Sequence, residues 1–168
     1  MKNLLILLIG LVFGTTLNAQ RFGIVDTELI LAKMPDYSQA QKQLDQLSQQ
    51  WQGEVESLLS EKEALEKAYN AEKVLLTEEK KIEKLAIIKK KEEDALALQR
   101  KYFGPDGEIF KKRRELIRPI QDKVYNAVQE VARKKKLDVV FNKSSDLVVL
   151  YNNKKADISD DVLEKLGF

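Results

Sequence analysis

The sequence predicts a mostly helical α+β protein. A long antiparallel helical hairpin, a coiled-coil arm, is expected to project from a small β-sheet body built from both chain ends. Three observations predict this fold. Residues 38–136 consist almost entirely of strong helix formers such as Gln, Glu, Lys, Leu and Ala. Short segments rich in β-forming residues precede and follow them. The 168 residues include only seven glycines and three prolines, too few for the many turns of a strand-rich sandwich.

The first 19 residues have the pattern of a secretory signal peptide. Lys2 is followed by an apolar run over residues 4–13 and then by small or polar residues that end at Ala19. The run is shorter than the roughly 20 apolar residues that a membrane-spanning helix needs. We therefore expect cleavage after Ala19 and a mature chain that lies outside the cytoplasm without a membrane anchor. The alternative is a buried N-terminal helix.

The start of the mature chain predicts a strand followed by a short helix. Residues 22–26 are mostly β-forming and apolar, which favours a strand. Asp26 or Thr27 is suited to cap a helix over residues 28–34, because a short oxygen-bearing side chain satisfies free N–H groups at a helix start. Pro35 is expected to end that helix.

The last 32 residues predict further strands and one more helix. Residues 137–141 and 147–151 are rich in β-forming residues and predict two strands. Residues 157–158 predict a short extended segment. Ser159 is expected to cap a final helix, and Gly167 stands where a helix commonly terminates.

These segments predict three parts of the chain. Residues 1–19 are the cleaved signal peptide, and residues 38–136 form the helical arm. Residues 20–37 and 137–168 together form a β-rich body, because strands from both ends are needed for one sheet. Three strands are near the lower limit of independent stability, so we expect the body to be an oligomerisation region.

Apolar residues at seven-residue spacing predict a coiled coil within the arm. The first run is Leu44, Trp51, Leu58 and Leu65, and the second is Phe110, Ile117, Val124 and Val131. A weaker run between them places a lysine in the predicted seam: Ile82, Lys89, Leu96 and Phe103.

Two sites in the arm could reverse the chain. One is residues 76–79, where Thr77 is a plausible helix cap followed by two acidic residues. The other is residues 104–107, which contain two glycines and a proline. We favour the first site because it gives legs of more nearly equal length, with 104–107 as a kink in the return leg. Pro119 predicts a further kink or helix restart.

The net charge of +2 conceals an uneven distribution that supports this hairpin. Residues 20–76 contain six basic and ten acidic residues, whereas residues 77–136 contain 18 basic and 11 acidic ones. An acidic outgoing leg and a basic return leg attract one another when they pair in antiparallel fashion. Exposed ion pairs stabilise little individually, so the register still depends on the apolar seam.

The absence of cysteine and histidine excludes many chemistries. Without cysteine there is no disulfide framework and no thiolate nucleophile, and without histidine the commonest general base and metal ligand are missing. Acidic runs such as Glu92, Glu93 and Asp94 lack the spacing of a calcium-binding loop. We therefore expect no enzyme activity, no metal and no cofactor.

Four segments together resemble a known family. They are residues 23–26, residues 120–128, residues 137–140, and the tail over residues 156–163 with Ser159 in its hydroxyl position. Their order, behind a signal peptide, resembles the Skp/OmpH family of periplasmic chaperones of outer-membrane proteins. Residues 104–107 and Pro119 depart from the family pattern.

The resemblance implies a homotrimer that holds unfolded outer-membrane proteins in the periplasm without ATP. Three sets of strands would form a central body, and three arms would enclose a cavity. The expected contacts of that trimer body are Ile24, Val25, Val139, Val140, Phe141, Val148 and Val149. The sequence contains no glycine-rich nucleotide loop of the GxxxxGK[ST] type, in agreement with ATP independence.

Two groups of arm residues are candidates for contact with partners. Ile87 and Ile88 are adjacent, so they cannot both face the seam equally, and Tyr102 and Phe103 lie at the expected kink. These four are the candidate client contacts, although apolar residues in a heptad usually form the seam instead. The basic cluster Lys111, Lys112, Arg113 and Arg114, with Arg118, is a candidate site for acidic client segments or for peripheral contact with anionic lipid. The alternative is a solvated helix face paired with the acidic leg.

Two other function classes compete with the holdase. A structural coiled-coil spacer of the cell envelope would favour a continuous heptad, and here Lys89, Arg113 and residues 104–107 interrupt the pattern. Nucleic-acid binding would be nonspecific and salt-dependent, because no groove-reading or base-stacking module is visible. We therefore expect no specific nucleic-acid partner.

Overall fold

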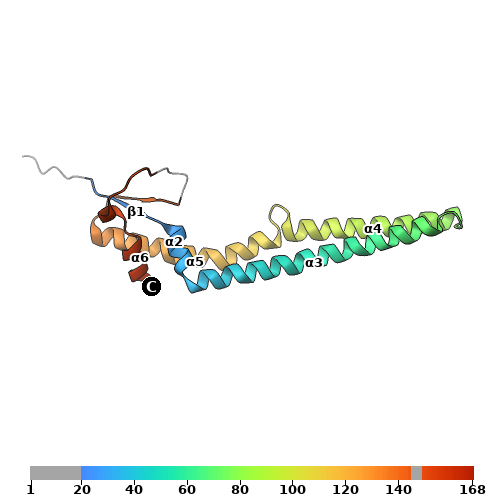
Figure 1. Cartoon of the computed structure of the whole chain (residues 1–168), viewed down its shortest axis with the longest axis horizontal. Coiled ribbons are helices and arrows are strands. Elements are labelled where there is room, and N and C mark those ends of the chain that lie inside the picture. The colour runs from blue at the N-terminus through green and yellow to red at the C-terminus, as the bar shows by residue number, and fades with distance from the viewer. Residues whose placement is uncertain (1–19, 145–148) are drawn as a thin grey trace, which may run out of the picture. The chain divides into compact units, whose positions relative to one another are not determined.

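The computed structural model describes residues 20–144 and 149–168, which form two compact units (Figure 1). The first unit contains residues 20–30 together with the described residues of 124–168, and the second contains residues 31–123. Long helices dominate, and a small sheet is formed by strands from the two chain ends. The mostly helical α+β fold predicted from the sequence is therefore confirmed. The predicted signal peptide over residues 1–19 lies outside the described residues, as does Val148.

The sheet of the first unit is parallel. Strand β1 (Phe22–Val25) pairs with β2 (Val139–Asn142) in a register that places Phe22 beside Val139. Ile24 of β1 also forms a bridge to Asp157, and the N–H of Ile158 donates to the carbonyl oxygen of Ile24 at 2.8 Å. The predicted strands near 22–26 and 137–141 and the extended segment at 157–158 are thus confirmed.

The third strand that the sequence predicted, over residues 147–151, is not found in its described part. Residues 149–151 are irregular, and Leu150 and Tyr151 are almost fully exposed. The physical reason lies at β1, where β2 pairs on one side and the segment at Asp157 bridges the other. Both edges of β1 are therefore occupied by segments that come from elsewhere in the C-terminal region.

Asp26 and Ser159 join the two ends of the chain by hydrogen bonds. The Asp26 carboxylate accepts from the N–H of Leu29 and from Ser144 Oγ, each at 2.9 Å, so Asp26 caps helix α2 (Thr27–Lys33) as predicted. The Leu29 N–H and, less strongly, the Ser144 hydroxyl hold the pKa of Asp26 below its usual value. The N–H of Asp26 in turn donates to Ser159 Oγ at 2.9 Å.

Helix α6 (Ser159–Leu166) begins differently from the prediction. Because the Ser159 hydroxyl is used by Asp26, it does not cap the helix. The Asp157 carboxylate instead accepts the N–H of Ser159 at 3.0 Å. At the other end, Gly167 adopts a left-handed conformation with φ of 90°, which confirms its predicted place just past the helix.

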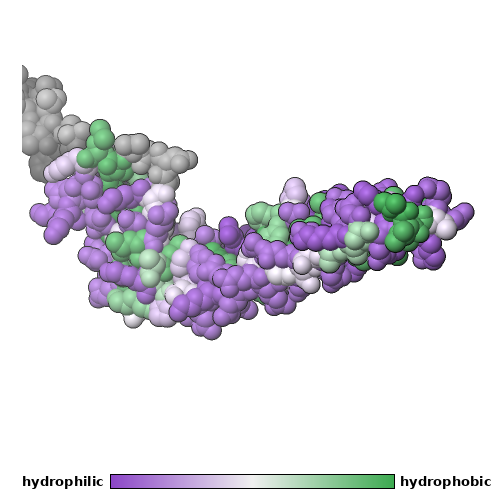
Figure 2. All heavy atoms as spheres, turned by 45° about the vertical axis from the view of Figure 1, so that its right-hand side comes forward, coloured by the Kyte–Doolittle hydropathy of each residue, from purple (hydrophilic) through white to green (hydrophobic). Residues whose placement is uncertain are grey.

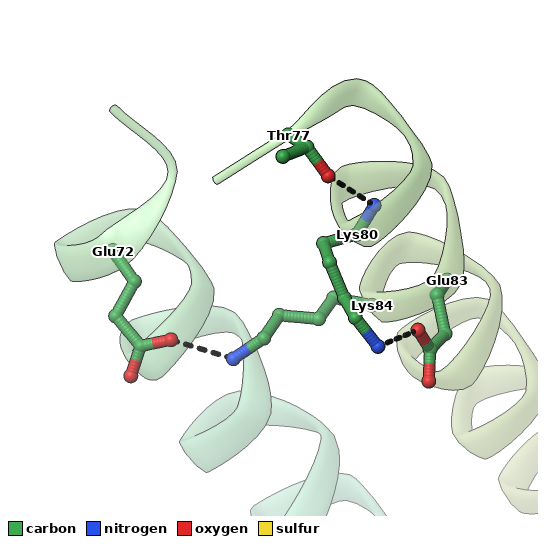
Figure 3. A network of polar contacts seen from close by, with 5 residues as sticks. All are labelled: Glu72, Thr77, Lys80, Glu83 and Lys84. Carbon is green, nitrogen blue, oxygen red and sulfur yellow. Dashed lines mark hydrogen bonds and ion pairs between the residues drawn. The ribbon is translucent and has the colours of Figure 1, made fainter. Parts of the chain in front are cut away.

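The second unit contains an antiparallel helical hairpin. Helix α3 (Pro35–Glu72) and helix α4 (Glu78–Phe103) lie side by side, and the chain reverses over residues 73–77 (Figure 1). Thr77 Oγ accepts the N–H of Lys80 at 3.4 Å, and Lys84 reaches across to Glu72 at 2.6 Å (Figure 3). The reversal favoured from the sequence is therefore confirmed.

Residues 104–107 form a short loop between α4 and helix α5 (Glu108–Lys135), while α3 continues without a break. The loop needs glycine at position 107, where a Cβ atom would lie 2.6 Å from the carbonyl oxygen of Tyr102. Pro119 lies inside α5, which is uninterrupted, so the helix restart considered for that position is not observed.

The surroundings of Gly107 and Gly53 predict opposite effects on stability when each glycine is replaced by alanine. Gly107→Ala places a methyl group against backbone, so we expect the free energy of unfolding to fall by about 2 kcal/mol. Gly53 lies inside α3 with open space around a Cβ atom, so Gly53→Ala should raise the free energy of unfolding by about 1 kcal/mol. Urea unfolding followed by the fluorescence of Trp51, the sole tryptophan, measures both. Effects of the same sign would contradict this account of the loop.

The seam of α4 is shifted by one residue from the predicted run. Ile88, Ala95 and Tyr102 are buried, whereas Ile82 and Leu96 of the predicted seam are exposed. The interleaved positions are lysines whose long stems cover the seam while their amines pair with α3: Lys84 with Glu72 and Lys91 with Glu61, each at 2.6 Å. The predicted seam over Ile82, Lys89, Leu96 and Phe103 is therefore wrong in phase.

Candidate interaction surfaces

Charge pairing across the hairpin follows the segregation predicted from the sequence. Three ion pairs join the legs, and each places its acid on α3 and its base on the return leg: Lys84 with Glu72, Lys91 with Glu61, and Lys123 with Asp36. The hydrogen bond from Lys91 to Glu61 raises the pKa of Lys91. Because these groups are partly exposed, each pair stabilises the hairpin little, and the register still depends mainly on the apolar seam.

A ring stack secures the hairpin beside the loop at residues 104–107. The rings of Trp51 and Tyr102 are nearly parallel, with centroids 4.7 Å apart. Tyr102 Oη donates to Glu54 Oε2 at 2.6 Å, which lowers the pKa of Glu54 and raises the pKa of Tyr102. Both aromatic side chains are therefore engaged within the hairpin.

One flank of the hairpin carries exposed apolar side chains that its own seam does not use. Leu85, Leu96 and Phe103 are spaced by eleven and seven residues, which places them on the same side of α4. Leu59 of α3 and Phe103 of α4 line a shallow hollow of about 460 Å³, here named the Leu59–Phe103 hollow. Its other lining residues are Ser48, Gln52, Val55, Glu56 and Gln99. Leu59, Leu85 and Leu96 are each exposed by more than two fifths of their surface: 44%, 48% and 43%.

The four candidate client contacts are separated by the structure. Ile88 and Tyr102 are 7% and 9% exposed within the seam, so the exposure expected of them is wrong. Their positions follow from the seven-residue spacing that they share with buried Ala95. Phe103 is half-buried and lines the Leu59–Phe103 hollow, whereas Ile87 is exposed beside a second hollow of about 150 Å³.

Leu59, Leu85 and Leu96 were not among the predicted contacts, although the sequence contained a signal for part of this flank. The heptad spacing of Leu96 and Phe103 predicts a seam position for both. Apolar residues at heptad positions of a hairpin usually lie in its core. Only the burial of the neighbouring run, which contains Ile88, shows that the run through Leu96 and Phe103 lies on the surface.

The predicted body residues lie on two faces of the sheet. By the register, Phe22, Ile24, Val139 and Phe141 share one face, and their side chains are partly or largely exposed. The rings of Phe22 and Phe141 stack on this face with centroids 6.0 Å apart. Val25 lies on the opposite face and is buried within the unit.

Two further body candidates, Val140 and Val149, are partly exposed. Val140 shares the face of Val25, whereas Val149 lies outside both strands. We name the face of Phe22, Ile24, Val139 and Phe141 the open sheet face.

The basic cluster of α5 contains two kinds of residue. Lys111 pairs with Glu108 at 2.8 Å and Lys112 pairs with Glu115 at 2.7 Å, so both are neutralised by their own helix. The three arginines at positions 113, 114 and 118 are exposed and have no ion pair with the described part of the chain. The pairing with the acidic leg that the sequence allowed is therefore not observed for this cluster, and the arginines remain candidates for anionic contact.

Two kinds of feature are absent from the described residues. No helix among them has an apolar stretch long enough to cross a membrane. Over the same part of the chain, no group of three or more acidic side chains is arranged to hold a metal ion.

Comparisons with known proteins agree with this architecture. A family model described as "Outer membrane protein (OmpH-like)" matches residues 21–166. An uncharacterized protein of Aquifex aeolicus is 29% identical over 145 residues, which cover 86% of this chain and 85% of the relative. A solved structure from Caulobacter crescentus, named as a candidate OmpH-like outer membrane chaperone, is similar with a TM-score of 0.70. That match has 17% identity and covers 91% of this chain and 88% of the other, so it shows similarity of fold alone.

Proposed function

The chain belongs to the OmpH-like family, and we propose that it is a periplasmic, ATP-independent holdase chaperone for unfolded outer-membrane proteins. The observation that carries this proposal is the exposed apolar flank of the hairpin around the Leu59–Phe103 hollow. The likeness to a candidate outer membrane chaperone supports it. The predicted signal peptide over residues 1–19 supports export from the cytoplasm.

The chemistry of this flank suits an unfolded membrane β-strand. Such strands alternate apolar and polar side chains, so an extended segment presents an apolar group at every second residue. Leu59, Leu85, Leu96 and Phe103 offer separated apolar contacts on a shallow surface, with glutamine and glutamate between them. Such contacts are individually weak and require no fixed sequence. Several contacts along one bound chain raise the overall affinity by effective concentration.

We assign the client contacts accordingly. Phe103 and Ile87 remain candidates, and Leu59, Leu85 and Leu96 join them. Ile88 and Tyr102 serve the seam instead. The arginines at positions 113, 114 and 118 attract acidic client segments or anionic lipid, and this attraction weakens with salt.

The homotrimer is part of the proposal. The open sheet face exposes two phenylalanines on a sheet that has two strands within the described residues, and such a sheet has little stability of its own in water. Association of three chains through this face would cover the apolar side chains. The three hairpins would then enclose the cavity in which a client is held.

Suppression of aggregation tests the function directly. An outer-membrane β-barrel protein is diluted from urea into buffer without nucleotide, and light scattering is recorded with increasing amounts of this protein. We expect suppression at about one trimer for each client. Full aggregation at several-fold trimer excess would contradict the holdase and leave the envelope spacer as the better hypothesis.

The double variant Leu59→Ser with Phe103→Ser tests the flank. We expect it to raise the concentration needed for half-suppression by about tenfold, because two apolar contacts are lost from each hairpin. Leu29→Ser is the matched control, since Leu29 is 42% exposed but belongs to α2 and the first unit, not to the hairpin. Equal loss in the control, or no loss in the double variant with an unchanged circular dichroism spectrum, would contradict the assignment.

A further inference from the structure

The end of the hairpin carries the most exposed apolar side chains of the second unit's described residues. Val74 and Leu75 are 87% and 88% exposed, and Ile82, one turn into α4, is 68% exposed. A compact hydrophobic patch is visible near this end of the molecule (Figure 2). We name residues 73–77 with Ile82 the tip.

The fold does not require apolar residues at the tip. The reversal is made by the Thr77 cap and by hydrogen bonds from the N–H groups of Lys73 and Leu75 to the carbonyl oxygens of Tyr69 and Glu72, both at 2.8 Å. Polar side chains would serve this turn equally, because Val74 and Leu75 bury almost none of their surface. The tip is also convex, because it is the outside of a turn. It therefore cannot enclose an extended client chain in the way that the Leu59–Phe103 hollow can.

The charges around the tip cancel. Residues 72–84 contain four lysines and four glutamates. Three of these lysines are held by glutamates at 2.6 to 2.7 Å. Figure 3 shows the pairs of Lys84 with Glu72 and of Lys80 with Glu83. The third pair joins Lys81 to Glu78. The apolar side chains of the tip are thus surrounded by neutral pairs of ammonium and carboxylate groups. Zwitterionic lipid headgroups are also neutral pairs, of ammonium and phosphate, so the tip complements a layer of such headgroups.

We propose that the tip is a membrane-interface contact that inserts Val74 and Leu75 into the headgroup region of zwitterionic phospholipid. The apolar side chains supply the affinity, while the paired lysines and glutamates bring no net charge to the interface. The two hydrogen-bonded amides of the turn remain satisfied on insertion, which limits the cost of leaving water. This contact is separate from the client-binding flank and does not depend on it.

Flotation with vesicles tests the proposal on the full chain. Vesicles of phosphatidylcholine alone are compared with vesicles that also contain phosphatidylglycerol, each at low and high salt. We expect binding to phosphatidylcholine that persists at high salt, because neutral apolar contact is not screened. The double variant Val74→Ser with Leu75→Ser should lower the partition coefficient by about tenfold. The control is Leu150→Ser with Tyr151→Ser, a pair that is 94% and 84% exposed in the first unit and should leave partitioning unchanged.

A label at the tip provides a second measurement. The chain has no cysteine, so Leu75→Cys carries a single nitrobenzoxadiazole dye. A blue shift on adding phosphatidylcholine vesicles is expected, whereas the same dye at Leu29→Cys should not shift.

Four results would overturn the proposal. The first is absence of binding to phosphatidylcholine, and the second is binding that requires phosphatidylglycerol and disappears at high salt. The third is an equal loss of vesicle binding in the control pair. The fourth is a tip variant that loses only the suppression of client aggregation. The second would point to the α5 arginines, and the last would make the tip a contact for unfolded chains.

Discussion

Ile30→Ala should lower the free energy of unfolding of the first unit by about 3 kcal/mol. Ile30 is fully buried, as are Ile158 and Val162 of the same unit. Truncation removes three carbon atoms from this small core, and the cavity left behind costs stability beyond the lost transfer free energy. Calorimetry at constant protein concentration measures the shift in the unfolding transition.

Leu29→Ala is the matched control for this cavity. Leu29 is the adjacent residue of α2 and is 42% exposed, so its truncation should cost less than about 1 kcal/mol. Both variants replace a large aliphatic residue of the same short helix by alanine. A similar loss in both would mean that helix propensity, and not burial, governs the effect.

Features of the fold that depend on local chemistry could be predicted from the sequence. Asp26 caps α2 and Thr77 caps α4, because a cap needs only a short oxygen-bearing side chain and free N–H groups three residues on. The left-handed Gly167 is a signal of the same local kind. The long helices followed from composition over many residues.

Features that depend on distant partners could not be predicted in the same way. Residues 147–151 contain as strong a strand signal as β2, yet the second edge of β1 is bridged at Asp157. Which segment pairs with β1 is decided by contacts between residues more than a hundred positions apart in the sequence. One of them is the hydrogen bond from the N–H of Asp26 to Ser159 Oγ. Propensity is a weak guide where tertiary pairing decides.

The candidate surface was mispredicted for a related reason. On α4 the predicted run has larger apolar residues, Leu96 and Phe103, than the true seam has at Ala95, although Lys89 interrupts it. The true seam is in turn interleaved with Lys84 and Lys91. The usual rule places the more apolar stripe inside. A protein that exposes apolar surface for binding would break this rule at its binding site, as we propose for this flank, and such local conflicts are where function is expected.

Phe141→Glu should convert the proposed trimer into a monomer. Phe141 lies on the open sheet face and is 38% exposed in the single chain, so the chain itself tolerates a polar side chain there. In a trimer that covers this face, three carboxylates would be buried without partners, which costs several kcal/mol for each. Light scattering coupled to size exclusion should report the mass of three chains for the natural protein and of one for the variant.

Phe168→Glu controls for the added charge. Phe168 follows α6 and is 52% exposed, so a carboxylate there stays in water and the trimer mass should persist. A monomeric natural protein, or a trimeric Phe141→Glu variant, would contradict assembly through the open sheet face. Circular dichroism on both variants distinguishes loss of assembly from loss of folding, because most of the signal arises from α3, α4 and α5.

The same variant distinguishes the role of assembly from that of client contact in the proposed holdase. Phe141→Glu leaves the Leu59–Phe103 hollow intact in each chain, since the hollow is lined only by α3 and α4. If three hairpins must hold one client together, losing assembly removes the effective concentration that links their contacts, and suppression should fall at least about tenfold. Suppression retained at equal chain concentration would mean that one hairpin is sufficient. The enclosed cavity would then be unnecessary, while the apolar flank would remain the site of binding.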